Sequence, residues 1–468
     1  MALAKTETRH SWKEVILPAN GIRTSRCDKI TLTGIEEKPS HIKPPVTASD
    51  GNENRLLQFA LEITTNLNKL SLGNNDAARI KTATSALELA ARVRPPQDTI
   101  MGLFASMSTV SAIRVFSHWK AFDLIPPEGG ISYSDLSQKL EAEEGLIRRI
   151  TSMLTSSHIL RHFSANSVGH TPTSLLLRSA EPMAAMFGLM YTNIIEVSTI
   201  LPSYFDTYGT KEPLGPSHVP TSFLAGQPEL GYFEMLSKDE ARMKGFMHAM
   251  SVTSHRRVPV TGMYDMNQLF RRMETEDLEE RVVWVDVGGG EGHILKRFRE
   301  EFPQLRKGRC VVVDLQGVVE EGKRKAGEEE ERRKSSNPEL LWHNVEFVAG
   351  DFMTEIPVRG AMVYYLRHIL RDYSDPVATV ILKTIARAMT PGISRVLISE
   401  QLNPPAEAAG PLPLYAAFKD YSMLSIAGKE RSLEQFEKIA EEAGLKVEGV
   451  FRDKATPQAV VELVLKGE

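Results

Sequence analysis

Acidic residues and glycines at the ends of apolar segments give this sequence its first chemical signal. Asp286 stands just before a glycine-rich turn, and Asp314 and Asp351 each follow a short apolar run. The turn reads Gly288-Gly289-Gly290-Glu291-Gly292. Glycines let a ligand approach the backbone, a following helix offers free N–H groups, and a carboxylate can accept hydrogen bonds from both hydroxyls of a ribose. With Phe352 beside Asp351 to flank a planar base, the set predicts a nucleoside-containing cofactor.

A dinucleotide is the obvious competing ligand for such a turn. Its binding motif places glycines in the order G-x-G-x-x-G. Here His293 stands where the third glycine belongs. The spacing therefore does not support a dinucleotide.

Strands and helices that alternate from about residue 280 must position these groups. The pattern predicts strands at 282–287, 310–313, 345–349, 361–365 and 395–399, helices at 293–302, 376–389 and 433–444, and closing strands within 445–465. Such alternation is typical of an α/β fold, a parallel sheet with helices on both faces. Because ligands bind at the carboxyl ends of parallel strands, the acids should meet at one edge of the sheet.

The N-terminal half has helical periodicity instead. Helices are expected within 55–90 and at 98–122, 181–208 and 231–255, with a Gly/Pro-rich loop at 209–230. Two short helices at 132–140 and 144–158 followed by a hairpin at 159–170 predict a winged helix. Without a basic recognition helix, we assign it to dimerisation rather than DNA binding. The expected domains are an extended or disordered arm (1–52), a helical and winged-helix dimerisation domain (53–178), linker helices lining the substrate pocket (179–278) and a cofactor-binding domain (279–468).

Bulk composition narrows the class of protein. A formal net charge of −4 gives no electrostatic case for nucleic acid or an anionic membrane. Two cysteines argue against a disulfide framework and fit a reducing compartment. We see no signal peptide and no uncharged apolar run of roughly 18 residues, the length of a spanning helix. The charged run 319–334 is expected to be a solvated helix. We therefore expect a cytoplasmic enzyme, and we assign no metal ligands.

Four segments together closely resemble the S-adenosyl-L-methionine motifs of class I small-molecule O-methyltransferases, of the plant caffeate type and its fungal relatives. These segments are 285–292, 313–315, 350–352 and 365–373, and the resemblance extends over roughly 55–465. It implies a class I methyltransferase Rossmann-like domain behind an all-helical and winged-helix dimerisation domain. It also implies S-adenosyl-L-methionine as cofactor, a small-molecule substrate and an intertwined homodimer.

The resemblance also assigns cofactor contacts. Asp286 and the turn would approach the cofactor, and the motif containing Asp314 and Leu315 would hold its ribose. Asp351 and Phe352 would hold the adenine. Arg367 stands where those enzymes place a basic residue on the cofactor.

One catalytic position departs from the family. In such methyltransferases a His-Asp pair follows the fourth strand, and its histidine deprotonates the acceptor hydroxyl; the matching pair here is Arg371-Asp372. A guanidinium stays protonated and has no lone pair to offer, so it cannot be that base. Glu400 and Glu430 match the acids that flank the family's histidine. Substrate-lining positions of the family correspond to Phe246, Met250 and Met423.

Three functions are compatible with this pattern, and the sequence favours the first. The first is a pericyclase, because the sequence resembles the O-methyltransferase-like pericyclases of fungal 2-pyridone pathways. There, dehydration followed by cyclisation of a polyketide–peptide intermediate needs fixed cations rather than a base. The second is an O-methyltransferase of a small hydroxyl compound that uses His368, three residues before Arg371 and able to face the same pocket from one helical turn. The third is a non-catalytic cofactor-binding subunit.

Overall fold

The structure, a computed structural model, describes residues 50–71, 75–251, 261–274, 281–333, 341–405, 414–454 and 456–467. Almost all of the predicted N-terminal arm lies outside these residues. The chain forms two compact units, one ending at Val93 and the other beginning at Arg94. The predicted domain boundaries at 52, 178 and 278 remain predictions.

Two helices make up the described part of the first unit, α1 (Asp50–Ser71) and α2 (Asp76–Val93). They pack against each other: Ser85 Oγ donates to Glu62 Oε2 at 3.0 Å, and the Arg92 guanidinium lies 4.8 Å from the centroid of the Phe59 ring. The helical periodicity expected over 55–90 is confirmed.

The second unit begins with a winged helix. After α3 (Pro96–His118) and α4 (Ala121–Leu124), a three-stranded antiparallel sheet of order β1-β3-β2 joins β1 (Ile131–Ser132), β2 (Leu160–Ser164) and β3 (Ser167–His170). The helices α5 (Tyr133–Leu140) and α6 (Glu144–Ser156) lie between β1 and β2 in sequence. Ser132 starts α5 by accepting the Asp135 N–H, as an N-cap residue should. The predicted winged helix is therefore present.

The middle helices differ from prediction in two places. After α7 (Pro172–Leu175) come α8 (Pro182–Met190), the π-helical turn η1 (Tyr191–Glu196) and α9 (Val197–Tyr208). The expected loop 209–230 contains a helix, α10 (Pro220–Leu224), with Pro220 at its first position. The expected helix 231–255 is two helices, α11 (Tyr232–Ser237) and α12 (Glu240–Met250), because the Asp239 side chain accepts the Arg242 N–H and starts a new helix. Residues 252–255 lie outside the described part.

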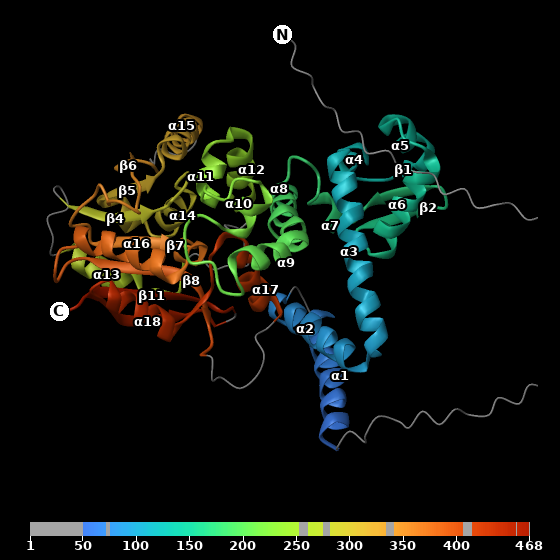
Figure 1. The fold of residues 1–468 in the computed structure, drawn as a ribbon, viewed down its shortest axis with the longest axis horizontal. Coiled ribbons are helices and arrows are strands. Elements are labelled where there is room, and N and C mark those ends of the chain that lie inside the picture. The colour runs from blue at the N-terminus through green and yellow to red at the C-terminus, as the bar shows by residue number, and fades with distance from the viewer. Residues whose placement is uncertain are drawn as a thin grey trace, which may run out of the picture. The chain divides into compact units, whose positions relative to one another are not determined.

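The C-terminal half is a mixed sheet of order β10-β11-β8-β7-β4-β5-β6, with β9 (Arg431–Ser432) paired to β8 (Figure 1). Its parallel strands are β4 (Val282–Val287), β5 (Arg309–Asp314), β6 (Val345–Ala349), β7 (Val363–Arg367) and β8 (Arg395–Asn403). The strands β10 (Leu445–Arg452) and β11 (Gln458–Leu465) close it antiparallel. Chain order reverses on either side of β4, which is where an open α/β sheet binds its ligand.

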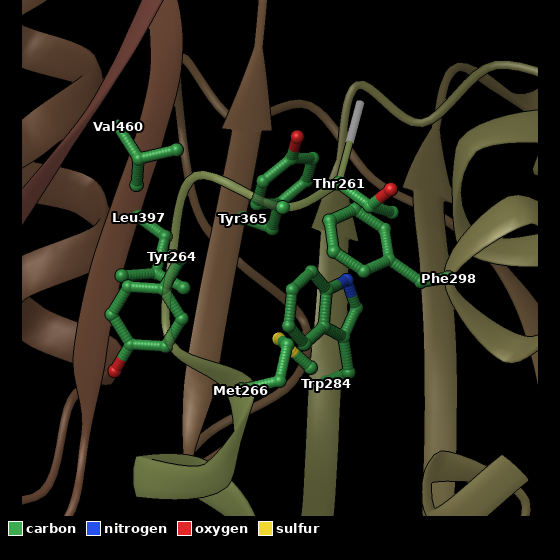
Figure 2. Close-up of a pocket in the computed structure, with 9 residues that line it drawn as sticks. Thr261, Tyr264, Met266, Trp284, Phe298, Tyr365, Leu397 and Val460 are labelled. Atoms are coloured by element: carbon green, nitrogen blue, oxygen red, sulfur yellow. The ribbon is translucent and has the colours of Figure 1, made fainter. Parts of the chain in front are cut away.

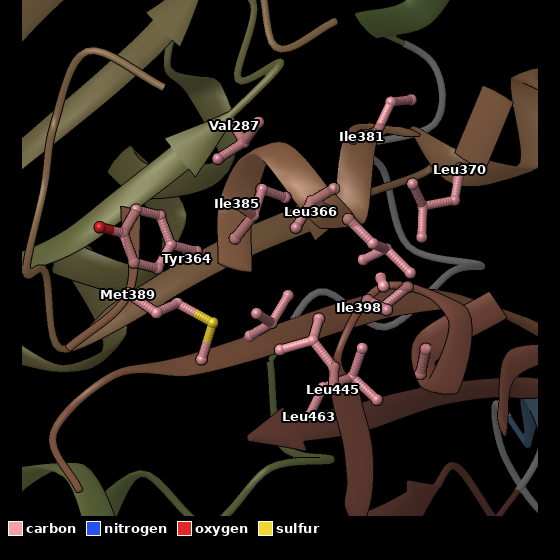
Figure 3. Packing of buried hydrophobic residues seen from close by; sticks show 14 of the residues in the cluster. Val287, Tyr364, Leu366, Leu370, Ile381, Ile385, Met389, Ile398, Leu445 and Leu463 are labelled. Carbon is pink, nitrogen blue, oxygen red and sulfur yellow. The ribbon is translucent and has the colours of Figure 1, made fainter. Parts of the chain in front are cut away.

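Helices cover both faces of this sheet. On one face, α16 (Asp375–Ala388) and α18 (Leu433–Glu442) pack through Ile381, Ile385 and their neighbours, as Figure 3 shows. On the other face lie α13 (Met266–Met273) and α14 (His293–Glu301). Neighbouring Tyr364 and Tyr365 of β7 bury on opposite faces, the alternation that a fully buried strand requires. The predicted α/β fold is confirmed, and the charged run forms the helix α15 (Gln316–Arg333). Between β8 and β9 lie α17 (Leu414–Met423) and the short 3-10 helix η5 (Leu424–Ile426).

Among the described residues, two helices are long and apolar enough, by length and composition alone, to cross a membrane: α3 and the continuous segment Pro182–Tyr208. Neither is mostly buried within the chain. On α3 the exposed large apolar residues are Ile100, Met101, Leu103, Phe104 and Met107. An exposed apolar face of this kind is typical of a protein or membrane contact.

Candidate active site

The glycine-rich turn follows β4 and is held from its neighbour β5. The N–H groups of Gly288 and Gly289 point to the Val313 carbonyl, at 2.8 and 3.4 Å, and Gly290 N–H donates to Asp314 Oδ2 at 2.8 Å. Gly288 and Gly290 have φ of +68° and +59°, which favour glycine. A Cβ on Gly289 would lie 2.7 Å from the Asp286 carboxyl carbon. A side chain at any of these positions would therefore strain the backbone or crowd a neighbouring side chain.

Asp286 and Asp314, from adjacent strands, form the acidic floor of the turn. Asp286 is 2 % exposed, and its Oδ2 has no hydrogen-bond partner among the described residues. Burial, reinforced by Asp314, raises the pKa of Asp286 to about 7. Asp314 accepts the N–H groups of Gly290 and Leu315, and burial raises its pKa. Each carboxylate oxygen has two lone pairs, so both acids retain capacity for a ligand's donors.

The other predicted cofactor residues lie on neighbouring segments. Asp351, exposed after β6, accepts the Met353 N–H at 2.9 Å, and the half-buried Phe352 ring lies 6.0 Å from that of Tyr373. Leu315 is 41 % exposed. Arg367, at the end of β7, is buried, and burial lowers its pKa. The acids thus gather at one edge of the sheet as expected.

The loop after β7 packs directly on this turn. A Cβ on Gly288 would meet Ile369 Cδ1 at 2.5 Å and Phe352 Cε1 at 3.5 Å. Directly after Ile369, the short 3-10 helix η4 (Leu370–Asp372) carries Arg371 and Asp372, the pair that the resemblance matches to the family's His-Asp. The loop that carries the predicted catalytic position therefore packs directly against the glycine-rich turn.

Arg371 is largely buried, with 12 % of its side chain exposed, and is held by carboxylates. Its Nη1 lies 2.8 Å from Glu430 Oε1, its Nε lies 3.7 Å from Asp372 Oδ1, and its Nη2 donates to the Met423 sulfur at 3.1 Å. Its backbone N–H donates to Glu400 Oε1 at 3.1 Å. Burial opposes the charge, but the three acids outweigh it and raise the pKa of Arg371. The guanidinium is a fixed cation and cannot act as a base.

Two of these acids have strongly raised pKa values. Burial, with a further contribution from Glu430, raises the pKa of Glu400 to about 7. Burial likewise raises the pKa of Asp372 to about 7, although the positive charge of Arg371 opposes the shift. Both carboxyls can therefore gain or lose a proton near neutral pH.

His368 does not share a helical turn with Arg371, contrary to the prediction. It has φ of +57°, its N–H donates to the Ser399 carbonyl at 3.2 Å, and its Nε2 lies 3.3 Å from Gln458 Nε2 of β11. Burial, aided by Arg367 and Arg371, holds the pKa of His368 well below its ordinary value. A neutral imidazole in this setting is a weak proton acceptor.

Three side chains that sequence reasoning missed complete the site. Lys419 of α17 lies 3.4 Å from Glu430 Oε1, and Asp420 accepts the Glu430 N–H at 2.8 Å. Arg431, fully buried, donates to the carbonyls of Leu370 and Tyr373, at 2.7 Å each, and so fixes the loop that carries Arg371. The charged pair Lys419-Asp420 inside an otherwise largely apolar helix was the available signal.

Two of the three predicted substrate-lining residues, Phe246 and Met423, lie in one apolar cluster, and Met250 does not belong to it. Met423 touches Arg371, and Phe246 belongs to the same apolar cluster as Met423 and packs on Phe233. Met250, at the end of α12, is half-buried. Met247, one turn earlier, has its Cε 3.3 Å from the position of a Cβ on Gly290 and so covers the glycine turn.

A separate small cavity lies on the other face of the sheet (Figure 2). Trp284, Phe298, Tyr365 and their neighbours line a volume of ≈ 10 Å³. This is room for about one water molecule. The cavity lies within the apolar core of that face, and none of the predicted site residues lines it.

Comparison with known proteins agrees with this geometry. A family model described as an O-methyltransferase domain matches residues 225–446. The methyltransferase pynC of Aspergillus niger is 33 % identical over 378 residues, which cover 80 % of this chain and 98 % of the relative. The solved structure of OxaC in complex with SAH and oxaline has a TM-score of 0.74 at 21 % identity and covers 88 % of this chain and 100 % of OxaC.

Two further solved structures share the fold. LepI in complex with SAM and a protein described as a pericyclic reaction enzyme each have a TM-score of 0.72 at 22 % identity, over 88 % of this chain and 100 % of theirs. Fold and site together define an S-adenosylmethionine-binding enzyme of the class I methyltransferase fold. The chain belongs to the O-methyltransferase family.

The residues present fit S-adenosylmethionine. The orphaned Asp286 oxygen, the spare lone pairs of Asp314 and the glycine cradle provide acceptors and close backbone approach for its ribose and amino acid parts. When bound, this cofactor supplies an electrophilic methyl group on a sulfonium. The individual cofactor contacts remain predictions.

Proposed function

We propose that this protein methylates a small-molecule acceptor, in secondary metabolism, with S-adenosylmethionine as donor. The observation that carries the proposal is the packing of the cofactor turn directly on the loop of Arg371, through Gly288 and Ile369. A reactive methyl group held at the turn would then face the charged groups beyond that loop. The relative of 33 % identity is named a methyltransferase, which supports the same choice.

In this proposal the chain's own residues position and stabilise rather than deprotonate. Arg371 offers fixed positive charge near the acceptor, since its Nη1 is anchored on Glu430. Arg431 and Asp420 hold the two backbones that present this pair. The apolar side chains of Phe246 and Met423 exclude water and orient the acceptor.

The direct test is a transfer assay with methyl-labelled cofactor and a panel of phenols, cyclic enols and amides. Label in an extracted small-molecule product, with stoichiometric S-adenosylhomocysteine, supports methyl transfer. A product isomeric with or dehydrated from its substrate, formed while the cofactor is unconsumed, would refute it.

The second outcome describes the alternative function. A pericyclase would dehydrate and cyclise a polyketide–peptide intermediate of the 2-pyridone type, using the cofactor as a bound cation. The observation in its favour is Arg371 itself, a buried cation at the base position that could stabilise negative charge developing on a carbonyl oxygen. The pericyclic reaction enzyme shares the fold at 22 % identity, which is no evidence of a shared reaction.

We further propose that the protein is a cytoplasmic homodimer. The exposed apolar residues of α3 are the surface that a second copy would cover. A homodimer explains that surface without a membrane.

A further inference from the structure

Two cations in the site share one carboxylate. Glu430 Oε1 lies 2.8 Å from Arg371 Nη1 and 3.4 Å from Lys419 Nζ, and the Glu430 side chain is 0 % exposed. The side chains of Arg371 and Lys419 retain 12 % and 15 % exposure, so neither is sealed off completely by its contact with Glu430. Burying like charges together is costly unless further negative charge is supplied.

The nearby acids do not supply that charge reliably. Asp372 and Glu400 both have pKa values raised to about 7, so each carries only a partial charge at neutral pH. With both protonated, two cations face the single carboxylate of Glu430. Burial, together with Arg371, lowers the pKa of Lys419, the shift expected of an ammonium that lacks enough negative charge around it.

We propose that Arg371 and Lys419 form a two-cation seat for an acceptor that reaches the site already ionised, an enolate or similarly acidic oxygen or nitrogen anion. This inference rests on the proposed methyl transfer and names its substrate class. It also explains the missing base: an acceptor that has lost its proton in solution needs none.

The charge balance of the step is simple. A lone pair of the anion forms one new bond to the methyl carbon while the sulfur–methyl bond breaks, and its electron pair goes to sulfur. The negative charge of the acceptor and the positive charge of the sulfonium cancel. No proton moves, so neither His368 nor Arg371 has to accept one.

The seat is tested by binding, with S-adenosylhomocysteine present and the full-length protein. Calorimetric titration compares 4-hydroxy-6-methyl-2-pyrone, a cyclic enol that is ionised at neutral pH, with its 4-methyl ether, which has the same ring and no acidic proton. Wild type should bind the enolate roughly tenfold more tightly than the ether. Equal affinities, or no binding of the enolate, would overturn the proposal.

Two variants separate charge from a proton-accepting role. Lys419→Met should remove the preference for the enolate and leave the affinity for the ether unchanged, whereas Lys419→Arg should keep the preference. Because a guanidinium cannot accept a proton, activity retained in Lys419→Arg excludes a lysine base. Loss of both affinities in Lys419→Met would show a structural role instead and refute the seat.

A measurement on wild type alone covers the case that Lys419→Met does not fold. Enolate affinity should fall as pH drops below the pKa of the pyrone, and ether affinity should stay constant; parallel curves would contradict the seat. Label transfer without enolate preference would leave the proposed function standing and this inference wrong. Enolate preference without label transfer would leave the two-cation seat standing and the proposed methyl transfer wrong.

Discussion

Arg371 and Glu430 form an ion pair, 2.8 Å between Nη1 and Oε1, at the position where the family resemblance predicts a catalytic base. The pair joins the loop after β7 to the loop before β9. Gly428 is part of the same junction, because a Cβ there would lie 2.3 Å from the Arg371 carbonyl. Two separate segments therefore hold Arg371 in place. An arginine that had arisen as an inconsequential surface substitution would not have such contacts.

Replacing Arg371 with Met should abolish turnover while S-adenosylmethionine still binds. The guanidinium contacts Glu430, Asp372 and Met423, none of which belongs to the glycine turn. Removing one partner of a buried pair should also cost on the order of 3 kcal/mol of unfolding free energy. The double variant Arg371→Met/Glu430→Gln should recover part of that stability and none of the activity, as measured by chemical denaturation and by the transfer assay. Normal turnover in the single variant would remove Arg371 from the mechanism.

His368→Asn should keep most of the activity. Asn tolerates the left-handed φ of +57° better than other residues and retains polar atoms for Gln458. If the neutral, buried imidazole is not the base, the variant's pH–rate profile should match that of wild type. Loss of turnover with intact cofactor binding and an altered pH profile would instead establish the methyltransferase mechanism that uses His368.

Gly288→Ala should weaken cofactor binding strongly. The new methyl group would lie 2.5 Å from Ile369 Cδ1, and the alanine backbone would have to adopt a φ of +68°. Gly392→Ala is a matched control, with φ of +72° and no atom within 4 Å of the new Cβ. Both should lose roughly 1 kcal/mol of stability from backbone strain, and Gly288→Ala should lose more because of the clash with Ile369. Calorimetry should find reduced cofactor affinity only in Gly288→Ala. Equal cofactor affinities would mean that the turn does not contact the cofactor.

Glu400→Gln should stabilise the fold increasingly as pH rises. The folded-state pKa of about 7 exceeds the ordinary 4.5, so the contribution of Glu400 to stability is full below pH 4.5 and is lost as pH rises toward 7. Gln avoids that loss, a gain on the order of 3 kcal/mol at pH 8 and near zero at pH 4. Urea denaturation across this range measures it. Glu355→Gln, the same substitution at an exposed position, is the control.

If the proposed homodimer forms through α3, light scattering should find wild type dimeric and the variant Met101→Glu/Phe104→Glu monomeric. These α3 side chains are 64 % and 58 % exposed in the chain alone, and charges there would oppose a second copy. Phe163→Glu, at 52 % exposure on the wing, is the control and should remain dimeric. A monomeric wild type would contradict the homodimer.

Sequence periodicity was sufficient for most of the fold. The strands at 282–287 and 345–349 have the predicted bounds, since runs of apolar residues between turns are set by local pattern. The two errors in the middle helices came from short signals. Asp239 starts a new helix by capping it, and Pro220 stands at the first position of a helix that was not expected. At both places a local signal for a helix start overrides the wider periodicity.

The sequence by itself determined which chemistry is missing, because an arginine at position 371 has no lone pair wherever it points. Only the tertiary structure decided what the arginine does instead. Glu430, the counter-ion of Arg371, and Lys419, which shares that carboxylate, both come from the part of the chain after β8. The order of the strands in the sheet brings them beside the end of β7. The spacing of His368 and Arg371 is also compatible with one helical turn. In the structure, however, the backbone N–H of His368 bonds to β8 and its side chain lies against Gln458 of β11. Side chains at the ends of distant strands meet through sheet topology, which local spacing does not encode.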